Sequence, residues 1–169
     1  AEIQTIVDQS SRGASNYYGA LESILQASSK INFTPQDTAN AFYETLSNQI
    51  GDSVSQIGSF IQEAGNLGKV TRSTLAQSAD AITAVMNSYN KGVGEAATIS
   101  AELFTLVDQG RVKLDEVANH MGNVSVPASQ LGVDFDNVVA ALSAISIAGI
   151  PAREAMTLQR NVMFKLIDP

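Results

Sequence analysis

The spacing of apolar residues is the feature that most restricts how this chain can fold. Apolar residues recur every three or four positions along almost the whole chain, and the strict alternation that marks a half-buried strand is hard to find. Such spacing predicts amphipathic helices, each of which buries one face against another element. The sequence therefore predicts an all-α fold, a compact multi-helix bundle or array of about seven or eight helices joined by short Gly/Pro turns.

Residues 1–30 carry the most regular form of this spacing. Apolar and small side chains step by four and three in strict alternation, as at the core positions of a heptad repeat: Ile3, Val7, Ser10, Ala14, Tyr17, Leu21, Ile24, Ser28 and Ile31. Gly13 and Gly19 weaken such a helix, because each glycine costs about 1 kcal/mol relative to alanine in a helix interior. We therefore expect a helix that holds only with a partner, and its expected interface consists of Ile3, Val7, Tyr17, Leu21 and Ile24.

Start and stop signals divide residues 31–169 into the short helices of a core domain, with residues 1–30 leading in from the rest of a longer chain. At Thr34-Pro35 an N-cap hydroxyl precedes a proline at the first helical position, where the missing N–H does no harm. Thr71 is expected to cap a later helix. Glycine or proline interrupts the apolar spacing at the other expected turns: residues 51, 65–68, 92–94, 110, 122–127 and 149–151.

One internal similarity concerns two helix starts. Residues 112–118 match residues 133–139 in their pattern of apolar and acidic positions. A repeat protein needs three or more stacked units, and two short copies fall below that number. The sequence therefore does not predict a repeat architecture.

Composition and charge exclude several classes of function. The chain has 17 Asp and Glu against 10 Lys and Arg, a net charge of −7, and its cations are scattered singly. Because nucleic-acid binding needs a basic face, no direct nucleic-acid contact is expected. The absence of cysteine excludes disulfides, zinc ribbons and a cysteine nucleophile. Charged residues make up only 16%, so we expect much of the surface to face other protein.

A search for catalytic and cofactor motifs yields only weak matches. Residues 92–97 fit the string GxGxxA, but a predicted helix rather than a strand precedes them, which favours a glycine-rich turn. Residues 65–70 contain a Gly-Lys pair without the spacing of a phosphate-binding loop. Glu22-Ser23 is similar to the acid-serine pair of lytic transglycosylases, but the segments that follow in those enzymes are missing.

The titratable residues also favour structural interpretations. His120 is the only histidine, and Glu116 lies four residues before it, which predicts a solvated contact on one helix face. Asp134 and Asp136 lie at an expected helix start, where carboxylates stabilise the positive end of the helix dipole. We assign no catalytic, cofactor-binding or metal-binding residue and expect no enzyme activity.

The C-terminal part of the chain contains an Ala-Gly-Ile turn, a Glu-Ala step, a Leu-x-Arg helix and a closing Asp-Pro. The residues of this pattern are Ala148, Gly149, Ile150, Glu154, Ala155, Leu158, Arg160, Phe164, Leu166, Asp168 and Pro169. In this pattern, and more weakly from about Ser28 onward, the chain resembles the core region of phage tail tape measure proteins. Residues 79–83, 114–117 and 131–133 match in the same order, whereas Gln159 and residues 123–126 depart from the pattern. The residues expected to belong to the family motif and the core are Gly149, Ile150, Glu154, Leu158, Arg160, Leu166, Asp168 and Pro169.

The resemblance implies a structural protein of a phage or prophage tail. Tape measure proteins are oligomers, commonly thought of as trimers, that lie in the lumen of the tail tube. Tube subunits polymerise around them until their end is reached, and they leave the tube ahead of the DNA. The implied partners are further copies of the chain, the tail tube protein, tail tip or baseplate hub proteins and tail assembly chaperones.

The implied location is the tail of the virion, and the host cytoplasm during assembly. Contact with a host membrane would come only through other parts of the longer chain, and no cofactor is implied. Two alternatives remain open at this point. One is a helical domain of an enzyme or toxin from a mobile element, for example one that degrades cell wall, and the other is a general helical adaptor module.

Overall fold

The part of the chain that the computed structural model describes, residues 13–168, contains eight α-helices and one short 3₁₀ turn. In chain order these elements are α2 (Gly13–Ile31), α3 (Pro35–Ser47), α4 (Val54–Thr71), α5 (Leu75–Ser88), η1 (Val93–Glu95), α6 (Ala96–Gly110), α7 (Leu114–Gln130), α8 (Phe135–Ile147) and α9 (Ala152–Ile167). The all-α prediction is therefore confirmed.

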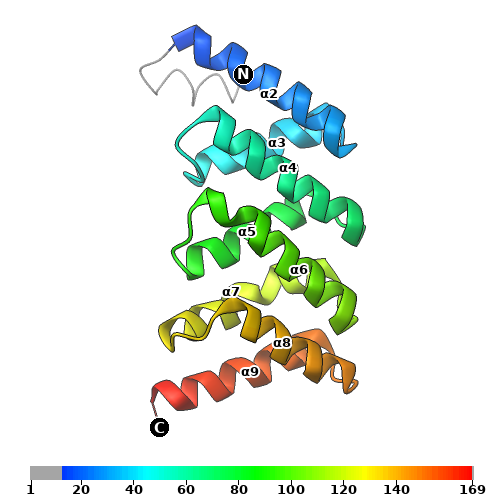
Figure 1. Ribbon diagram of the computed structural model, residues 1–169, viewed down its shortest axis with the longest axis vertical. Helices are drawn as coiled ribbons and strands as arrows, with labels where there is room; N and C mark the ends of the chain where they lie inside the picture. Colours follow the sequence, from blue (N-terminus) through cyan, green and yellow to red (C-terminus); the bar gives the residue numbers. More distant parts are fainter. Residues whose placement is uncertain (1–12, 169) are drawn as a thin grey trace.

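The helices stack in two layers that run from the N-terminal to the C-terminal end of the molecule (Figure 1). One layer contains α2, α4, α6 and α8, and the other contains α3, α5, α7 and α9. The most extensive contacts join helices that are next but one in the chain, namely α5 with α7, α7 with α9 and α6 with α8. Consecutive helices pack across the two layers, as α4 does on α5. Each pair of helices thus adds one step to the stack, as in α-solenoids.

This stack is a repeat architecture, which the sequence analysis did not predict. The helices of the second layer begin at Pro35, Leu75, Leu114 and Ala152, at intervals of 40, 39 and 38 residues. The similar segments 112–118 and 133–139 lie instead at the starts of α7 and α8, in different layers. The structural period is hidden because a buried position accepts many apolar residues, so the repeat keeps its spacing of apolar residues and not their identity.

Hydroxyl side chains cap the N-termini of three helices, α3, α4 and α5. The Thr34 hydroxyl accepts a hydrogen bond from the Asp37 N–H at 3.1 Å, as the sequence predicts for α3. At α5 the cap is Thr74, whose hydroxyl accepts from the Gln77 N–H while the Gln77 side chain accepts from the Thr74 N–H. The prediction that Thr71 caps this helix is wrong, because Thr71 is the last residue of α4.

Glycines inside α4 serve packing rather than turning. The sequence predicts that residues 65–68 end this helix, but it continues to Thr71. A Cβ atom at Gly65 would lie 2.6 Å from the Cβ of Ile31, which is closer than real Cβ atoms approach one another. The missing side chain therefore lets α2 pack directly against the backbone of α4.

The predicted turn over residues 122–127 is also absent, since α7 continues through it to Gln130. A proline inside a helix removes one backbone hydrogen bond and costs about 3 kcal/mol. Burial on both sides of Pro127 offsets that cost, because Val124 and Ala128 are fully buried on the same inward face. The chain turns instead at Gly132, which has a φ of +70°.

The remaining predicted turns are confirmed. α3, α6 and α8 end near residues 51, 110 and 149, and η1 occupies the glycine-rich segment 92–97 together with the start of α6.

One continuous hydrophobic core lies between the two layers of helices. This core extends from Ile24 in α2 to Met163 in α9. The division expected between residues 30 and 31 falls at the end of α2, where side chains on both sides of it are buried in this core. No helix in the described range is long and apolar enough to cross a membrane.

Candidate functional site

The structure describes only some of the residues expected to form an N-terminal interface. Ile3 and Val7 lie outside the described residues, and so does the side chain of Tyr17. Leu21 is 36% exposed and remains on the surface of α2. Ile24 is 4% exposed and packs into the core, so this side chain is used within the chain and not at a surface open to a partner.

The C-terminal residues that carry the resemblance separate into turn, core and surface. Gly149 forms the turn before α9 with a φ of +95°, and Ile150 packs against the core. At the other end of α9 the Asp168 N–H donates to the Phe164 carbonyl at 3.0 Å. Glu154 is exposed in the first turn and Arg160 is half-buried, while Pro169 lies outside the described residues.

Two of these residues differ from the expectation that they belong to the core. Leu158 is 43% exposed and Leu166 is 65% exposed. The side of α9 that packs on α7 carries Ala155, Met156 and Met163 instead, all of them buried. Within residues 13–168, no later helix exists to cover the outer side of α9.

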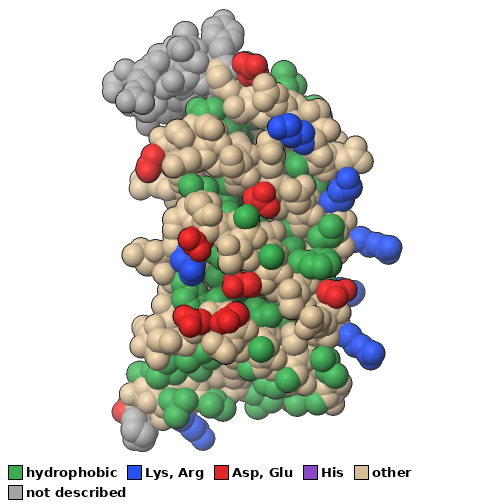
Figure 2. Space-filling view, in the orientation of Figure 1, with side chains coloured by type: hydrophobic (Ala, Val, Ile, Leu, Met, Phe, Trp, Pro, Cys, Tyr) green, Lys and Arg blue, Asp and Glu red, His purple; other side chains and the backbone are tan. Residues whose placement is uncertain are grey.

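Exposed apolar side chains gather at this end of the stack, over α8 and α9. We define the C-terminal face by its large exposed apolar residues: Ile147, Leu158, Val162, Phe164, Leu166 and Ile167. In the view of Figure 2, hydrophobic side chains gather at the lower end of the molecule, where these helices lie. A concentration of exposed apolar residues of this kind marks an interaction surface more often than isolated ones do.

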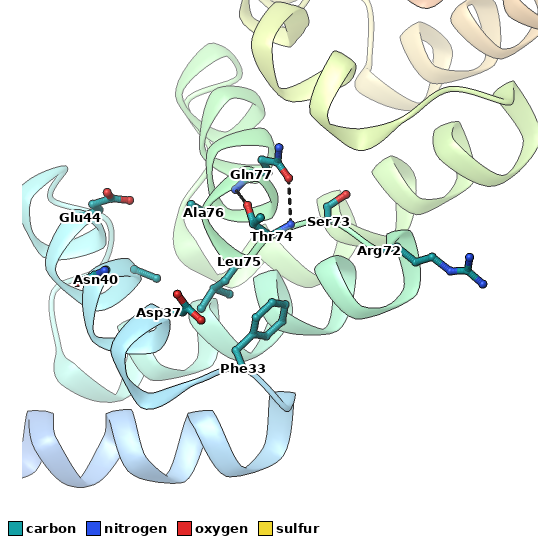
Figure 3. A pocket seen from close by; sticks show the side chains of 11 residues that line it. Phe33, Asp37, Asn40, Glu44, Arg72, Ser73, Thr74, Leu75, Ala76 and Gln77 are labelled. Carbon is teal, nitrogen blue, oxygen red and sulfur yellow. Dashed lines mark hydrogen bonds between the residues drawn. The ribbon is translucent and has the colours of Figure 1, made fainter.

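A groove of about 430 Å³ lies where α3 meets the turn between α4 and α5 (Figure 3). Phe33 and residues 37–44 form one wall, and residues 72–77 form the other. Three of its polar residues are engaged in helix caps, since the Asp37 carboxylate accepts from the Thr34 hydroxyl at 2.6 Å and Thr74 and Gln77 bond to each other. The groove therefore reflects how α3 and α5 begin.

A smaller groove of about 210 Å³ between α7 and α9 contains the only histidine of the chain. His120 and Asn123 from α7 face Arg153, Met156, Thr157 and Arg160 from α9. The expected pair with Glu116 forms no hydrogen bond in the part of the chain that the structure describes. This grouping could not be found from sequence, because the two arginines share a groove with His120 only when α9 stacks on α7. Among residues 13–168 no group of histidine, cysteine and acidic side chains could hold a metal ion.

Acidic residues gather around Tyr89, where the end of α5 meets the start of α8. The Tyr89 hydroxyl donates to the Val133 carbonyl at 3.0 Å, and its ring meets Phe135 edge to face with centroids 5.9 Å apart. Burial, followed by the negative charge of Asp134, raises the pKa of Tyr89 to about 12. The pKa of Glu102 is also raised, first by burial and then by Asp136. This cluster joins two steps of the stack.

Comparison with known protein families identifies the one to which the chain is similar over most of its length. The sequence profile of the phage-related minor tail protein family matches residues 21–169. The chain belongs to this family. No curated protein and no solved structure matches it significantly.

The match gives this minor tail protein its place in a phage tail, as a component of the virion. It begins in α2 at Leu21 and extends over every later helix of the stack. The C-terminal face lies within the matched range, whereas most of the heptad-like segment, residues 1–20, lies outside it. The matched range therefore covers all of the stack except the first turns of α2.

Proposed function

We propose that this chain is the core segment of a tape measure protein, which lies in the lumen of the tail tube, organises assembly of the tail and leaves the tube when the genome is ejected. The observation that carries the proposal is the ordered resemblance of residues 148–169 to the tape measure core, within a chain of the minor tail protein family. The proposed partners are further copies of the chain, as a trimer, together with the tail tube protein, tip or hub proteins and assembly chaperones.

The geometry favours an assembly role over the role of a ruler. As one continuous helix, residues 13–168 would span about 230 Å at 1.5 Å per residue. Folded, each layer holds four helices at spacings of about 10 Å, so the stack is only roughly 40 Å long. The folded segment thus adds little length for its number of residues. Tail length would be measured by continuous helix elsewhere in the full-length protein.

Two deletions in the full-length gene test this division of roles by electron microscopy of tails. Removal of a heptad-rich stretch outside this chain should shorten tails by about 1.5 Å for each residue removed. Removal of residues 151–166 should abolish or misdirect assembly, because it deletes Met156 and Met163 from the core. Viable tails that are merely slightly shorter after the second deletion would make this segment part of the ruler and contradict the proposal.

The proposal also holds that the chain has no catalytic role. Asp115, Glu116 and His120 are the titratable residues of the first two turns of α7, and each is at least partly exposed. Alanine at any of them should leave tail assembly and infectivity nearly intact, with a change in stability of about 1 kcal/mol or less. Normal tails that have lost infectivity would instead favour an enzyme.

A further inference from the structure

The outer side of α9 can be compared directly with earlier helices of its layer, because all of them begin in the same register. Counted from the first residue of each helix, Val85 of α5, Val124 of α7 and Val162 of α9 occupy the same position. The first two are completely buried, whereas Val162 is 59% exposed. α5 and α7 each have a later helix of the layer stacked on them, and α9 has none among the described residues.

The positions one turn before and one turn after Val162 repeat this contrast. Leu158 is 43% exposed, whereas its counterpart in α5, Ala81, is fully buried and its counterpart in α7, His120, is partly buried. Leu166 is 65% exposed, and its counterpart in α7, Ala128, is fully buried. Residues four apart lie on one side of a helix, so Leu158, Val162 and Leu166 form a single outer stripe along α9.

The last helix of the other layer, α8, also has apolar side chains that no later helix covers within residues 13–168. Ile145 is only half-buried, whereas Leu106, at the same position in α6, is fully buried. Ala141 and Ala144 are exposed on α8, and its single charged residue is Asp136. A helix that is apolar on most of its sides is normally covered by other elements. Both layers therefore end on apolar surface.

We propose that the C-terminal face receives a further helical hairpin of the same protein, which continues the stack by one step as each hairpin within residues 13–168 does. One helix of the hairpin packs on α8 as α8 packs on α6, and the other packs on α9 as α9 packs on α7. The occupant is thus a pair of amphipathic helices with apolar residues every three or four positions. This proposal rests on the register of the stack and not on the assignment as a tape measure.

The direction of the helices favours such a hairpin over a second copy of this chain. Because the chain reverses at each turn, all helices of one layer run in the same direction (Figure 1). A second copy related by a two-fold axis could not continue both layers in this way, because an axis that pairs α9 with α9 and α8 with α8 at once makes both pairs antiparallel, and same-layer contacts of that kind do not occur within residues 13–168. A hairpin that continues the stack reproduces the parallel contact already made between α7 and α9.

Thiol labelling tests the proposal, because the chain has no cysteine of its own. Leu158→Cys and Val162→Cys place single thiols on the stripe, and Asn161→Cys and Thr157→Cys are controls at exposed polar positions of the same helix. In phage tails that contain the protein, maleimide should label the stripe thiols at least about tenfold more slowly than the controls, and all four equally fast in urea. Equal rates in native tails would show an open face and overturn the proposal.

The occupant is identified by placing a photoreactive amino acid at position 162 in the same tails. Mass spectrometry of the cross-linked peptide should find a segment of the same protein outside residues 1–169 whose apolar residues recur at helical spacing. A cross-link to a different protein would overturn the proposal. A cross-link to α8 or α9 of another copy would identify a second copy and overturn the proposal, as would a cross-link to a segment without that spacing. In the purified chain, labelling of Val162→Cys should be fast at every protein concentration, and protection that increases with concentration would likewise indicate a second copy.

Discussion

α5 and α9 belong to the same layer and begin in the same register, yet one is a central helix and the other is the last. α5 is in contact with α3 on one side and α7 on the other, and its exposed positions are occupied by Ala76, Asp80 and Asn87. α9 is in contact with α7 alone in its layer, and its outer side carries leucine and valine. The apolar spacing of the two helices is similar. The place of a helix in the stack, and not its own apolar pattern, therefore decides which of its apolar residues are buried in the core.

The strongest test of this comparison introduces a charge at equivalent positions of the two helices. Val85→Asp should leave the chain largely unfolded, because an unpaired carboxylate in the core costs about 4 kcal/mol or more. Val162→Asp should change the free energy of unfolding by only about 0.5 kcal/mol, since the side chain is mostly in water. Urea denaturation of the purified chain, followed by circular dichroism, measures both. Comparable losses in the two variants would contradict the assignment of α9 as an open end.

A second test compares a closely packed glycine with an open one. Gly65→Ala should destabilise the chain by about 1–3 kcal/mol, because Ile31 would have to move away from the new Cβ atom. Gly122→Ala should stabilise it by about 0.5–1 kcal/mol, since nothing lies within 4 Å of that position and alanine favours the helix. The midpoint of urea unfolding should decrease for Gly65→Ala and increase for Gly122→Ala. A gain in stability at Gly65 would show that α2 and α4 are not in close contact.

The smallest effect concerns the link between α5 and α8. Tyr89→Phe removes the hydrogen bond to the Val133 carbonyl and keeps the aromatic contact with Phe135, so it should cost about 1 kcal/mol at neutral pH. A loss well below that value, with unchanged unfolding cooperativity, would place Tyr89 outside the packing between these helices.

The free energy of unfolding should also depend on pH differently in Tyr89→Phe and in the wild-type chain. The pKa of Tyr89 is about 12 in the folded chain and 10.0 for an unperturbed tyrosine, so the folded state holds the phenolic proton more tightly. Its contribution to stability is complete below pH 10 and is lost as pH rises toward 12. The wild-type chain should therefore lose more stability than Tyr89→Phe between pH 10 and pH 12, as measured by urea titrations across that range. Parallel curves would mean that Tyr89 is not buried.

Features of the fold that depend on neighbouring residues could be predicted from the sequence, and features that depend on tertiary packing could not. The cap at Thr34 and the turn at Gly149 were predictable, because each depends on interactions within one helical turn. Local propensity predicts breaks at Gly65 and Pro127, but α4 and α7 continue through them, because burial that local propensity does not include stabilises both helices. The spacing of Leu158 and Leu166 also fits a core, so their exposure could not be predicted from the sequence.

The sequence by itself determined that the chain is helical, acidic and divided by turns, because these properties depend on residues close together along the chain. Only the tertiary structure decided that the helices stack at intervals of 38 to 40 residues and that the stack ends on an apolar face. It also decided that His120, Arg153 and Arg160 line one groove. The physical reason is that an amphipathic helix specifies an apolar side to be covered, while the helix that covers it is selected by packing between segments far apart in the chain.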